Sequence, residues 1–277
     1  MIPPDYLMLR LARRFLPNGF TQAALRAQIL IRPGLETRDP EAAASLYMDA
    51  LKTRGRELSG ATVFVLGYGG YFGMAVQLLK MGARHVTLCD PYAQLSDQAN
   101  VRLAIQAPEY LTRSGGQVRL DPLRITVLPV DVRQIAAQRL CQDLDLVLSW
   151  SVYEHLVHPG EVTAALGQIT SPNGCNLHFI DLRDHFFRHP FEMLCYRDQV
   201  WGTWLNPSSN LNRWRTWQYQ EIFQQCFDQV QVEVPERDLS GFLRVRERIR
   251  PQFLTGDDQI DSATRLMVYS AEPRVQR

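Results

Sequence analysis

Residues 62–73 of the chain read Thr62-Val63-Phe64-Val65-Leu66-Gly67-Tyr68-Gly69-Gly70-Tyr71-Phe72-Gly73. The first five residues predict a buried strand, and the glycines after them predict a tight turn. A helix-like run from Met74 to Lys80 follows. Free N–H groups at the start of such a helix can face a polar ligand, so the unit predicts a binding loop, although such turns also occur without a ligand.

Strand-like and helix-like segments alternate along the rest of the chain, at 85–89, 125–128, 144–150, 175–180, 217–227, 230–234 and 265–270. This alternation is typical of a parallel sheet built from β-α-β units. We expect one α/β domain at residues 59–277. An N-terminal helical cap at residues 1–58 should precede it, with an amphipathic helix at 5–15 and a second helix at 40–58 that starts at Asp39.

Composition excludes several classes of protein. The chain has 30 basic and 29 acidic residues and a net charge of +1, which argues against nucleic acid as a partner. No apolar run approaches the roughly 20 residues of a membrane helix, and no secretion signal is evident. The five cysteines are far apart in sequence, so we expect a reducing, cytoplasmic location. Nothing in the sequence indicates an oligomeric state.

Two further predicted strands end in carboxylates. Asp90, followed by Pro91, ends the second strand, where the ribose hydroxyls of an adenosine cofactor would lie. Asp131 follows the third strand and could reach an adenine amino group. Asp90 could instead cap the next helix. To this point a nicotinamide cofactor and S-adenosylmethionine both fit the residues.

The fourth predicted strand carries a resemblance to a known family. Leu144-Asp145-Leu146-Val147-Leu148 leads into Ser149-Trp150-Ser151-Val152-Tyr153-Glu154-His155-Leu156, with Pro159 nearby. This resembles the class I S-adenosylmethionine-dependent methyltransferases of the small-molecule type, whose fourth strand is commonly followed by a Glu-His pair. Over residues 58–272 the resemblance implies a Rossmann-like, doubly wound and mostly parallel sheet of seven strands, the last antiparallel, with an insertion after strand five.

The resemblance also implies a cofactor site for S-adenosylmethionine, with S-adenosylhomocysteine as the product. It places Gly67, Tyr68 and Gly69 at the methionine moiety and Asp90 with Pro91 at the ribose. It further assigns Asp131 and Val132 to the adenine, and Ser149 and Trp150 to the lining of the site. Two positions depart from the family pattern, since Val65 replaces a frequent acid and Tyr71 a glycine.

Candidate acceptor residues follow strands four and five. His155 is the first candidate for a general base, because imidazole titrates near neutral pH, and His185 is the second, expected on the opposite wall. Alternatively, Glu154 and His155 only stabilise their loop. No metal is expected, because the histidines and acids at 178–189 have no recognised spacing. Acceptor contacts are assigned to Tyr153, Asp181, Arg183, Asp184, Trp201 and Trp204.

The insertion at about 182–216 is expected to be a substrate lid, or else an excursion that its tryptophans pin to the domain. We therefore predict methyl transfer to oxygen, nitrogen or carbon of a small molecule, in a biosynthetic pathway. An NAD(P)-dependent oxidoreductase is one alternative, suggested by the spacing of Gly67, Gly69 and Gly73. A non-catalytic binding protein of the same fold is the other.

Overall fold

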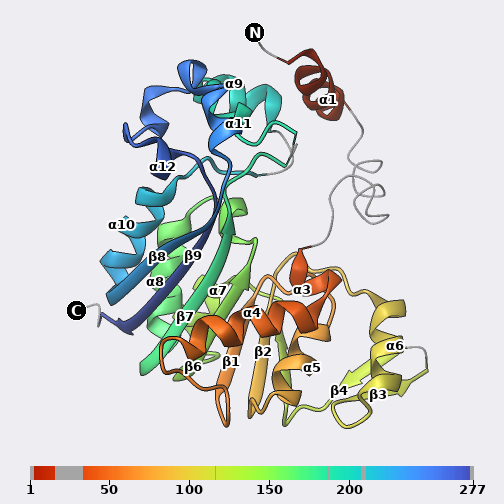
Figure 1. Cartoon of the computed structure of the whole chain (residues 1–277). Coiled ribbons are helices and arrows are strands. Elements are labelled where there is room, and N and C mark those ends of the chain that lie inside the picture. Colours follow the sequence, from red (N-terminus) through yellow and green to blue (C-terminus); the bar gives the residue numbers. More distant parts are fainter. Residues whose placement is uncertain (1–2, 16–33, 116, 186–187, 207–209, 275–277) are drawn as a thin grey trace.

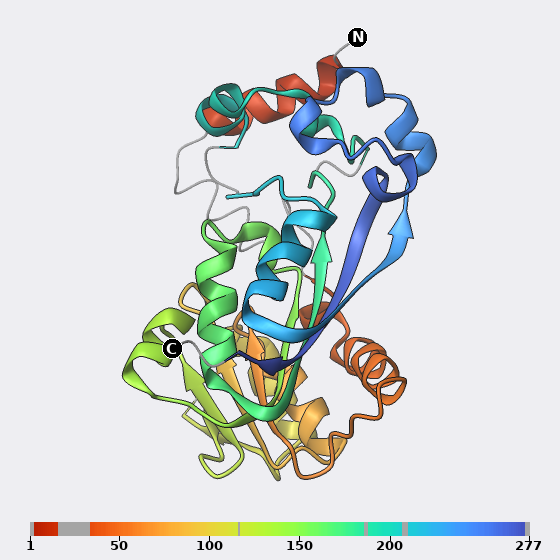
Figure 2. The same cartoon turned by 90° about the vertical axis from the view of Figure 1, so that its left-hand side faces the viewer.

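The computed structural model describes residues 3–15, 34–115, 117–185, 188–206 and 210–274. Within these ranges a central sheet lies between two layers of helices (Figures 1 and 2). A group of short helices stands beyond the upper end of the long strands in Figure 1. We call this group, formed by residues 4–15, 188–206, 210–215 and 238–261, the helical lobe.

The central sheet has seven strands in the order β5-β2-β1-β6-β7-β9-β8. The five strands from β5 to β7 are parallel, and β9 runs antiparallel to both of its neighbours. This confirms the predicted sheet and its antiparallel last strand. The strands are β1 (Thr62–Leu66), β2 (His85–Cys89), β5 (Ile125–Leu128), β6 (Leu144–Trp150), β7 (Thr170–Asp181), β8 (Phe227–Arg237) and β9 (Ala263–Pro273).

Both faces of the sheet are covered, because successive side chains of a strand point to opposite faces. Val63 and Val65 face one hydrophobic core, and Phe64 and Leu66 face the other. The first core includes residues of α4 (Pro40–Lys52), α5 (Gly73–Lys80) and α6 (Asp97–Gln106). The second includes residues of α7 (Val132–Gln138), α8 (Pro159–Ile169) and α10 (Thr216–Cys226). This arrangement is the predicted doubly wound fold.

Two features of this part of the chain differ from the prediction. The helix expected over 40–58 ends at Lys52, and Gly55 then adopts a left-handed φ of 66°. Asp39 is its N-cap as predicted, since its carboxylate accepts the N–H of Ala42 at 3.0 Å. A separate hairpin of β3 (Leu111–Ser114) and β4 (Gln117–Leu120) was not predicted.

The helical lobe has its own apolar core, to which Leu7 and Leu11 of α1 (Pro4–Phe15) contribute. α1 packs on the lobe element η3 (Trp201–Leu205), far along the chain, while α4 packs on the sheet (Figure 2). The predicted N-terminal cap is therefore divided between two places in the fold. The other lobe elements are η2 (Glu192–Cys195), α9 (Asp198–Val200), α11 (Leu239–Leu243), η4 (Arg246–Arg248), η5 (Pro251–Phe253) and α12 (Asp258–Asp261).

A buried carboxyl group joins α3 (Leu35–Arg38) to α4. Glu36 is 4% exposed and accepts the hydroxyl of Tyr47 at 2.7 Å. Burial raises the pKa of Glu36 to about 8 from an ordinary value of 4.5. The carboxyl therefore stabilises the fold below about pH 4.5, and this contribution is lost as pH rises toward 8, because the unfolded chain releases the proton first.

Glu36→Gln should relieve this cost because an amide does not ionise. At about pH 8 we expect the variant to unfold with a free energy higher than wild type by roughly 3–5 kcal/mol, at about 1.4 kcal/mol per pKa unit. The difference should shrink toward about pH 5, where the carboxyl is protonated in the folded protein. Urea unfolding at both pH values, with the exposed Glu41→Gln as control, measures it; a pH-independent difference contradicts the assignment.

Candidate cofactor and acceptor site

The glycine loop after β1 is held in a conformation that favours glycine. Gly67, Gly69 and Gly70 have φ values of 81°, 68° and 86°. A Cβ on Gly67 would lie 2.3 Å from Val152 Cγ2, and one on Gly70 would lie 1.9 Å from the carbonyl oxygen of Gln94. Gly69 is the most open of the three, with Thr37 Oγ1 as its nearest atom at 3.2 Å. The loop backbone can therefore approach a ligand closely at Gly69.

Asn100 holds this loop in place, a role that sequence reasoning missed. Its side chain, on α6, is buried, accepts the N–H of Phe72 at 3.0 Å and donates to the carbonyl of Gly70 at 2.9 Å. The N–H of Ser96 donates to the same carbonyl at 3.1 Å. A single asparagine within an amphipathic helix gives no sequence signal for such a contact.

Asp90 lies at the carboxyl end of β2, beside the glycine loop. Its carboxylate accepts the N–H of Gly69 at 3.2 Å and the N–H of Tyr92 at 2.9 Å. The loop and the acid therefore come together as predicted from the order of the strands. Tyr68 is buried beneath them, and burial, reinforced by Asp90, raises the pKa of its hydroxyl to about 12. Pro91 is exposed.

Asp131 follows β5 and caps α7. It accepts the N–H of Arg133 at 2.8 Å and pairs with the guanidinium of the same residue at 2.8 Å, which lowers the pKa of its carboxyl. The ion pair is partly exposed, so the carboxylate remains within reach of a ligand. Val132 is buried in the core and offers mainly its backbone.

Ser149 and Trp150, expected to line the cofactor, both point into the sheet packing. Ser149 is fully buried, with Oγ 2.8 Å from Nδ1 of His178. Burial lowers the pKa of His178 to about 3, so this imidazole is neutral at physiological pH. Trp150 stacks on Phe179 with ring centroids 4.2 Å apart. For these two side chains the structure favours a packing role, which leaves their backbones at the edge of the sheet.

The Glu154-His155 pair lies in the short helix η1 (Tyr153–His155) after β6. Asn212, from the insertion, holds this helix: its amide donates to the carbonyls of Tyr153 at 2.7 Å and Leu156 at 3.0 Å, and its own N–H donates to the carbonyl of Glu154 at 2.7 Å. Asn212 is therefore a positioning residue that the sequence did not reveal. Tyr153, expected to bind the acceptor, is fully buried against α8 and α10.

His155 and His185 lie side by side, with ring centroids 4.8 Å apart. The expectation that they face each other from opposite walls is wrong. The reason is topological: β6 and β7 are adjacent parallel strands, so the loops that follow them begin at neighbouring points of the same edge. The two candidate bases thus belong to one cluster.

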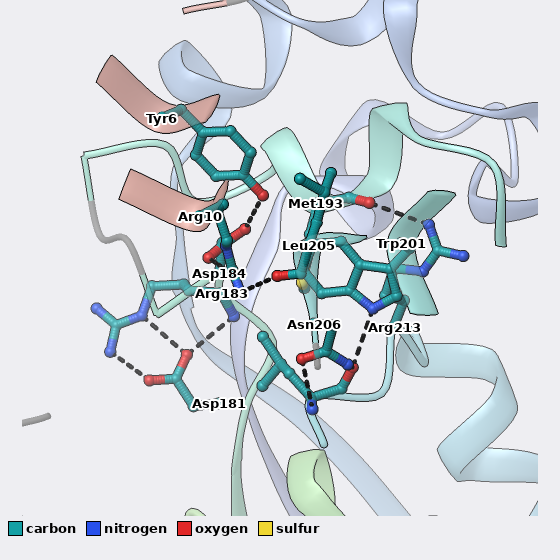
Figure 3. A network of polar contacts seen from close by, with 11 residues as sticks. Tyr6, Arg10, Asp181, Arg183, Asp184, Met193, Trp201, Leu205, Asn206 and Arg213 are labelled. Carbon is teal, nitrogen blue, oxygen red and sulfur yellow. Dashed lines mark hydrogen bonds and ion pairs between the residues drawn. The ribbon is translucent and has the colours of Figure 1, made fainter. Parts of the chain in front are cut away.

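The predicted acceptor residues after β7 are mostly paired within the protein. Asp181 accepts two hydrogen bonds from the guanidinium of Arg183, at 2.9 and 2.6 Å. Asp184 is fully buried and accepts the hydroxyl of Tyr6 at 2.6 Å and the guanidinium of Arg10 (Figure 3). Asp184 thus anchors α1, and the structure favours this packing role over the predicted acceptor contact. Arg183 borders a hollow of about 450 Å³ next to β8.

The two tryptophans assigned to the acceptor differ in exposure. Trp201 is buried between Arg10 and Arg213, and its indole N–H donates to the carbonyl of Leu211 at 3.3 Å (Figure 3). It pins the insertion to α1, which was the alternative role considered for the tryptophans. Trp204 is 48% exposed and remains open to a ligand.

The sheet order, with an antiparallel strand between β7 and β8, defines the class I methyltransferase fold, and comparison with solved structures agrees. A proposed methyltransferase of Haloferax volcanii, in complex with the Trm112 methyltransferase activator, superposes with a TM-score of 0.50 and 16% identity, over 87% of this chain and 92% of that one. Phosphoethanolamine N-methyltransferase 2 of Haemonchus contortus, bound to phosphomonomethylethanolamine and S-adenosylhomocysteine, gives 0.51 and 15%, over 83% of this chain and 53% of that one.

No family model and no curated protein sequence matches the chain. The likeness therefore lies in the fold, at an identity too low to transfer an activity. Among the described residues, no helix combines the length and apolar character that crossing a membrane requires.

Proposed function

We propose that the protein transfers a methyl group from S-adenosylmethionine to a small-molecule acceptor. One observation carries the proposal: the glycine loop, Asp90 and Asp131 follow three adjacent strands, β1, β2 and β5, at the carboxyl edge of the sheet. Ligands of open α/β sheets bind at this edge, beside the point where the strand order reverses. In this sheet that point lies between β1 and β6.

The residues present fit this cofactor. The open backbone at Gly69 would face its methionine moiety, the Asp90 carboxylate its ribose hydroxyls, and the Asp131 carboxylate its adenine amino group. When bound, the cofactor supplies an electrophilic methyl group on a sulfonium sulfur. The chain has to hold the acceptor in line with that group, exclude water and accept a proton where the acceptor carries one. We assign the proton transfer to the cluster of His155 and His185.

The two alternatives are less well supported. The classic dinucleotide-binding sheet has the order 3-2-1-4-5-6, whereas here antiparallel β9 lies between β7 and β8. A non-catalytic role would follow if the two departures from the family pattern, Val65 and Tyr71, disturbed the cofactor site. Val65 is buried in the core. The Tyr71 ring packs against Gly73, since a Cβ on Gly73 would lie 2.3 Å from Tyr71 Cε1. Both departures are thus accommodated by packing, away from the open backbone at Gly69.

The balanced charge and the mixed polar and aromatic surroundings of the cluster support a small acceptor rather than nucleic acid. A cytoplasmic location is part of the same proposal, since all five cysteines are free thiols. Oxygen, nitrogen and carbon acceptors are each compatible with an imidazole base.

Titration calorimetry with S-adenosylhomocysteine and with NADH tests the proposal. We expect the first to bind and the second not to bind. Asp90→Ala should weaken the binding about 10- to 100-fold, because a hydrogen bond to a charged group is worth about 1.5–3 kcal/mol. Asp90→Asn removes the charge at the ribose but keeps an oxygen that can accept the N–H of Gly69. This variant therefore separates loss of the ribose contact from loss of order in the glycine loop.

The exposed Asp97→Ala is the matched control for the change of charge and should bind like wild type. Unchanged affinity in both Asp90 variants would remove Asp90 from the site. Binding of NADH alone would replace the methyltransferase proposal by the oxidoreductase one.

A further inference from the structure

Glu154, His155 and His185 bring one carboxylate and two imidazoles together beyond the ends of β6 and β7. One ligand atom from each residue lies within 4.8 Å of the others. An ion held at about 2.0–2.2 Å from each donor needs donors about 3–4 Å apart, so small side-chain rotations would close the set. Among the described residues, no other group of three histidine, cysteine or acidic side chains comes as close.

Glu154 provides a second, independent observation. It is 2% exposed, and among the described residues neither of its carboxylate oxygens has a partner with good hydrogen-bond geometry. The backbone N–H groups of Glu154 and Asp181 and the hydroxyl of Ser151 lie close enough to favour its charged form only weakly. Burial raises the pKa of this carboxyl well above its ordinary value. A buried carboxyl without a well-aligned hydrogen-bond partner is costly, and the guanidinium of Arg183 forms its ion pair with Asp181. The side chain thus has unused ligand capacity beside two imidazoles.

We propose that Glu154, His155 and His185 form a binding site for a divalent cation of the zinc type. Two imidazoles and one carboxylate favour Zn²⁺ or a similar transition metal over Mg²⁺, which prefers oxygen ligands. Three protein ligands are also typical of catalytic zinc sites, which keep a position open for water or substrate. The proposal departs from the sequence-based expectation of no metal. The sequence contains no recognised metal-ligand spacing, because His185 lies 30 positions after His155 and 31 after Glu154.

The cluster lies on the acceptor side of the proposed cofactor site, so its role rests on the proposed function. Val152, two residues before Glu154, contacts the glycine loop at Gly67. With the cation bound, His155 and His185 would act as its ligands, and the cation would take over the role proposed for the two imidazoles as bases. It would bind a hydroxyl oxygen of the acceptor and lower the pKa of that hydroxyl, whose proton leaves to solvent. That oxygen then forms the new bond to the methyl carbon, while the carbon–sulfur bond breaks and its electron pair stays on sulfur, giving the neutral thioether.

Titration of the purified full chain with Co²⁺, a coloured substitute for Zn²⁺, tests the site without any assay of activity. We expect about one equivalent to bind and produce visible absorption bands. His155→Ala and His185→Ala should each weaken binding more than about tenfold, as should Glu154→Gln, which retains the shape of the side chain. The exposed His158→Ala is the matched control and should bind like wild type.

Two results would overturn the site: wild type that binds neither Co²⁺ nor Zn²⁺, or binding that persists unchanged in the His155 and His185 variants. Circular dichroism of each variant establishes that it is folded, and the two histidine variants keep the test valid if Glu154→Gln does not fold. Calorimetry with S-adenosylhomocysteine on the same samples keeps the cofactor question separate, because the metal ligands do not contact that molecule in the proposed arrangement.

Acetohydroxamate, a small oxygen chelator, tests the acceptor position. Added to the Co²⁺-loaded protein, it should shift the absorption bands by occupying the open position. An unchanged spectrum would mean a closed, structural ion, and it would overturn the role in acceptor binding.

Discussion

His155→Ala is expected to lower single-turnover methyl transfer about 10²- to 10⁴-fold, the usual cost of removing a general base. Its affinity for S-adenosylhomocysteine should stay close to that of wild type. The reason is position: His155 lies in η1 after β6, whereas the proposed ribose and adenine contacts follow β2 and β5. Single-turnover rates over a range of pH, once an acceptor is found, together with calorimetry, measure both parts of the prediction.

The contact between the two histidines also determines the result expected for the second variant, His185→Ala. Because His185 lies beside His155 with ring centroids 4.8 Å apart, His185→Ala should cause a loss of similar size. The exposed His158→Ala, three positions along the chain, should transfer methyl groups at the wild-type rate. Near-wild-type rates in both cluster variants would contradict the base role and would favour catalysis by positioning alone.

Local patterns of the sequence predicted the sheet well. The runs at 62–66, 85–89, 125–128 and 144–150 coincide with β1, β2, β5 and β6. Each is a short apolar run between turn residues. β1, β2 and β6 are buried on both faces by helices, whereas β5, at the edge of the sheet, is only partly buried. The site residues that sit directly at strand ends, Gly69 and Asp90 among them, came together for the same reason: parallel strands bring their carboxyl ends to one edge.

Contacts between distant segments could not be predicted in this way. The Asn100 and Asn212 side chains each bond backbone groups 28 or more positions away. An asparagine carries no periodicity that identifies such a partner. The adjacency of His155 and His185 required the order of β6 and β7 as well as the course of both loops. The exposure of each side chain could not be predicted from the sequence either. Tyr153, Ser149 and Trp201 have suitable chemistry for a site, but all three are buried.

The helical lobe was the least predictable part of the fold. Its core combines α1 with residues from 191–253, so no single segment shows a complete hydrophobic pattern. The insertion was expected to be a lid, and the structure shows what fixes it: Arg10 of α1 is buried, donates to the carbonyl of Leu205 at 3.0 Å and stacks over Trp201 at 4.7 Å (Figure 3). The guanidinium of Arg10 also pairs with the buried carboxylate of Asp184.

Asp184→Ala should therefore detach α1 from the lobe. The change leaves Arg10 buried without its ion-pair partner and removes the acceptor of the Tyr6 hydroxyl. Breaking a buried ion pair on one side typically costs about 3–5 kcal/mol. We expect hydrogen exchange of the α1 amides to lose that much protection, whereas amides of β1 and β2 in the central sheet should change little.

Two further variants separate the ion pair from a general effect of removing a charge. Asp228→Ala breaks the exposed pair with Arg274 and should cost at most about 1 kcal/mol. Arg10→Met in the Asp184→Ala background removes the uncompensated charge, and should recover part of the lost protection, because apolar side chains often replace a buried ion pair without loss. If Asp184→Ala alone kept the protection of α1, the apolar contacts of Leu7 and Leu11 would be sufficient to hold the helix, and the insertion would not depend on the buried pair for its attachment.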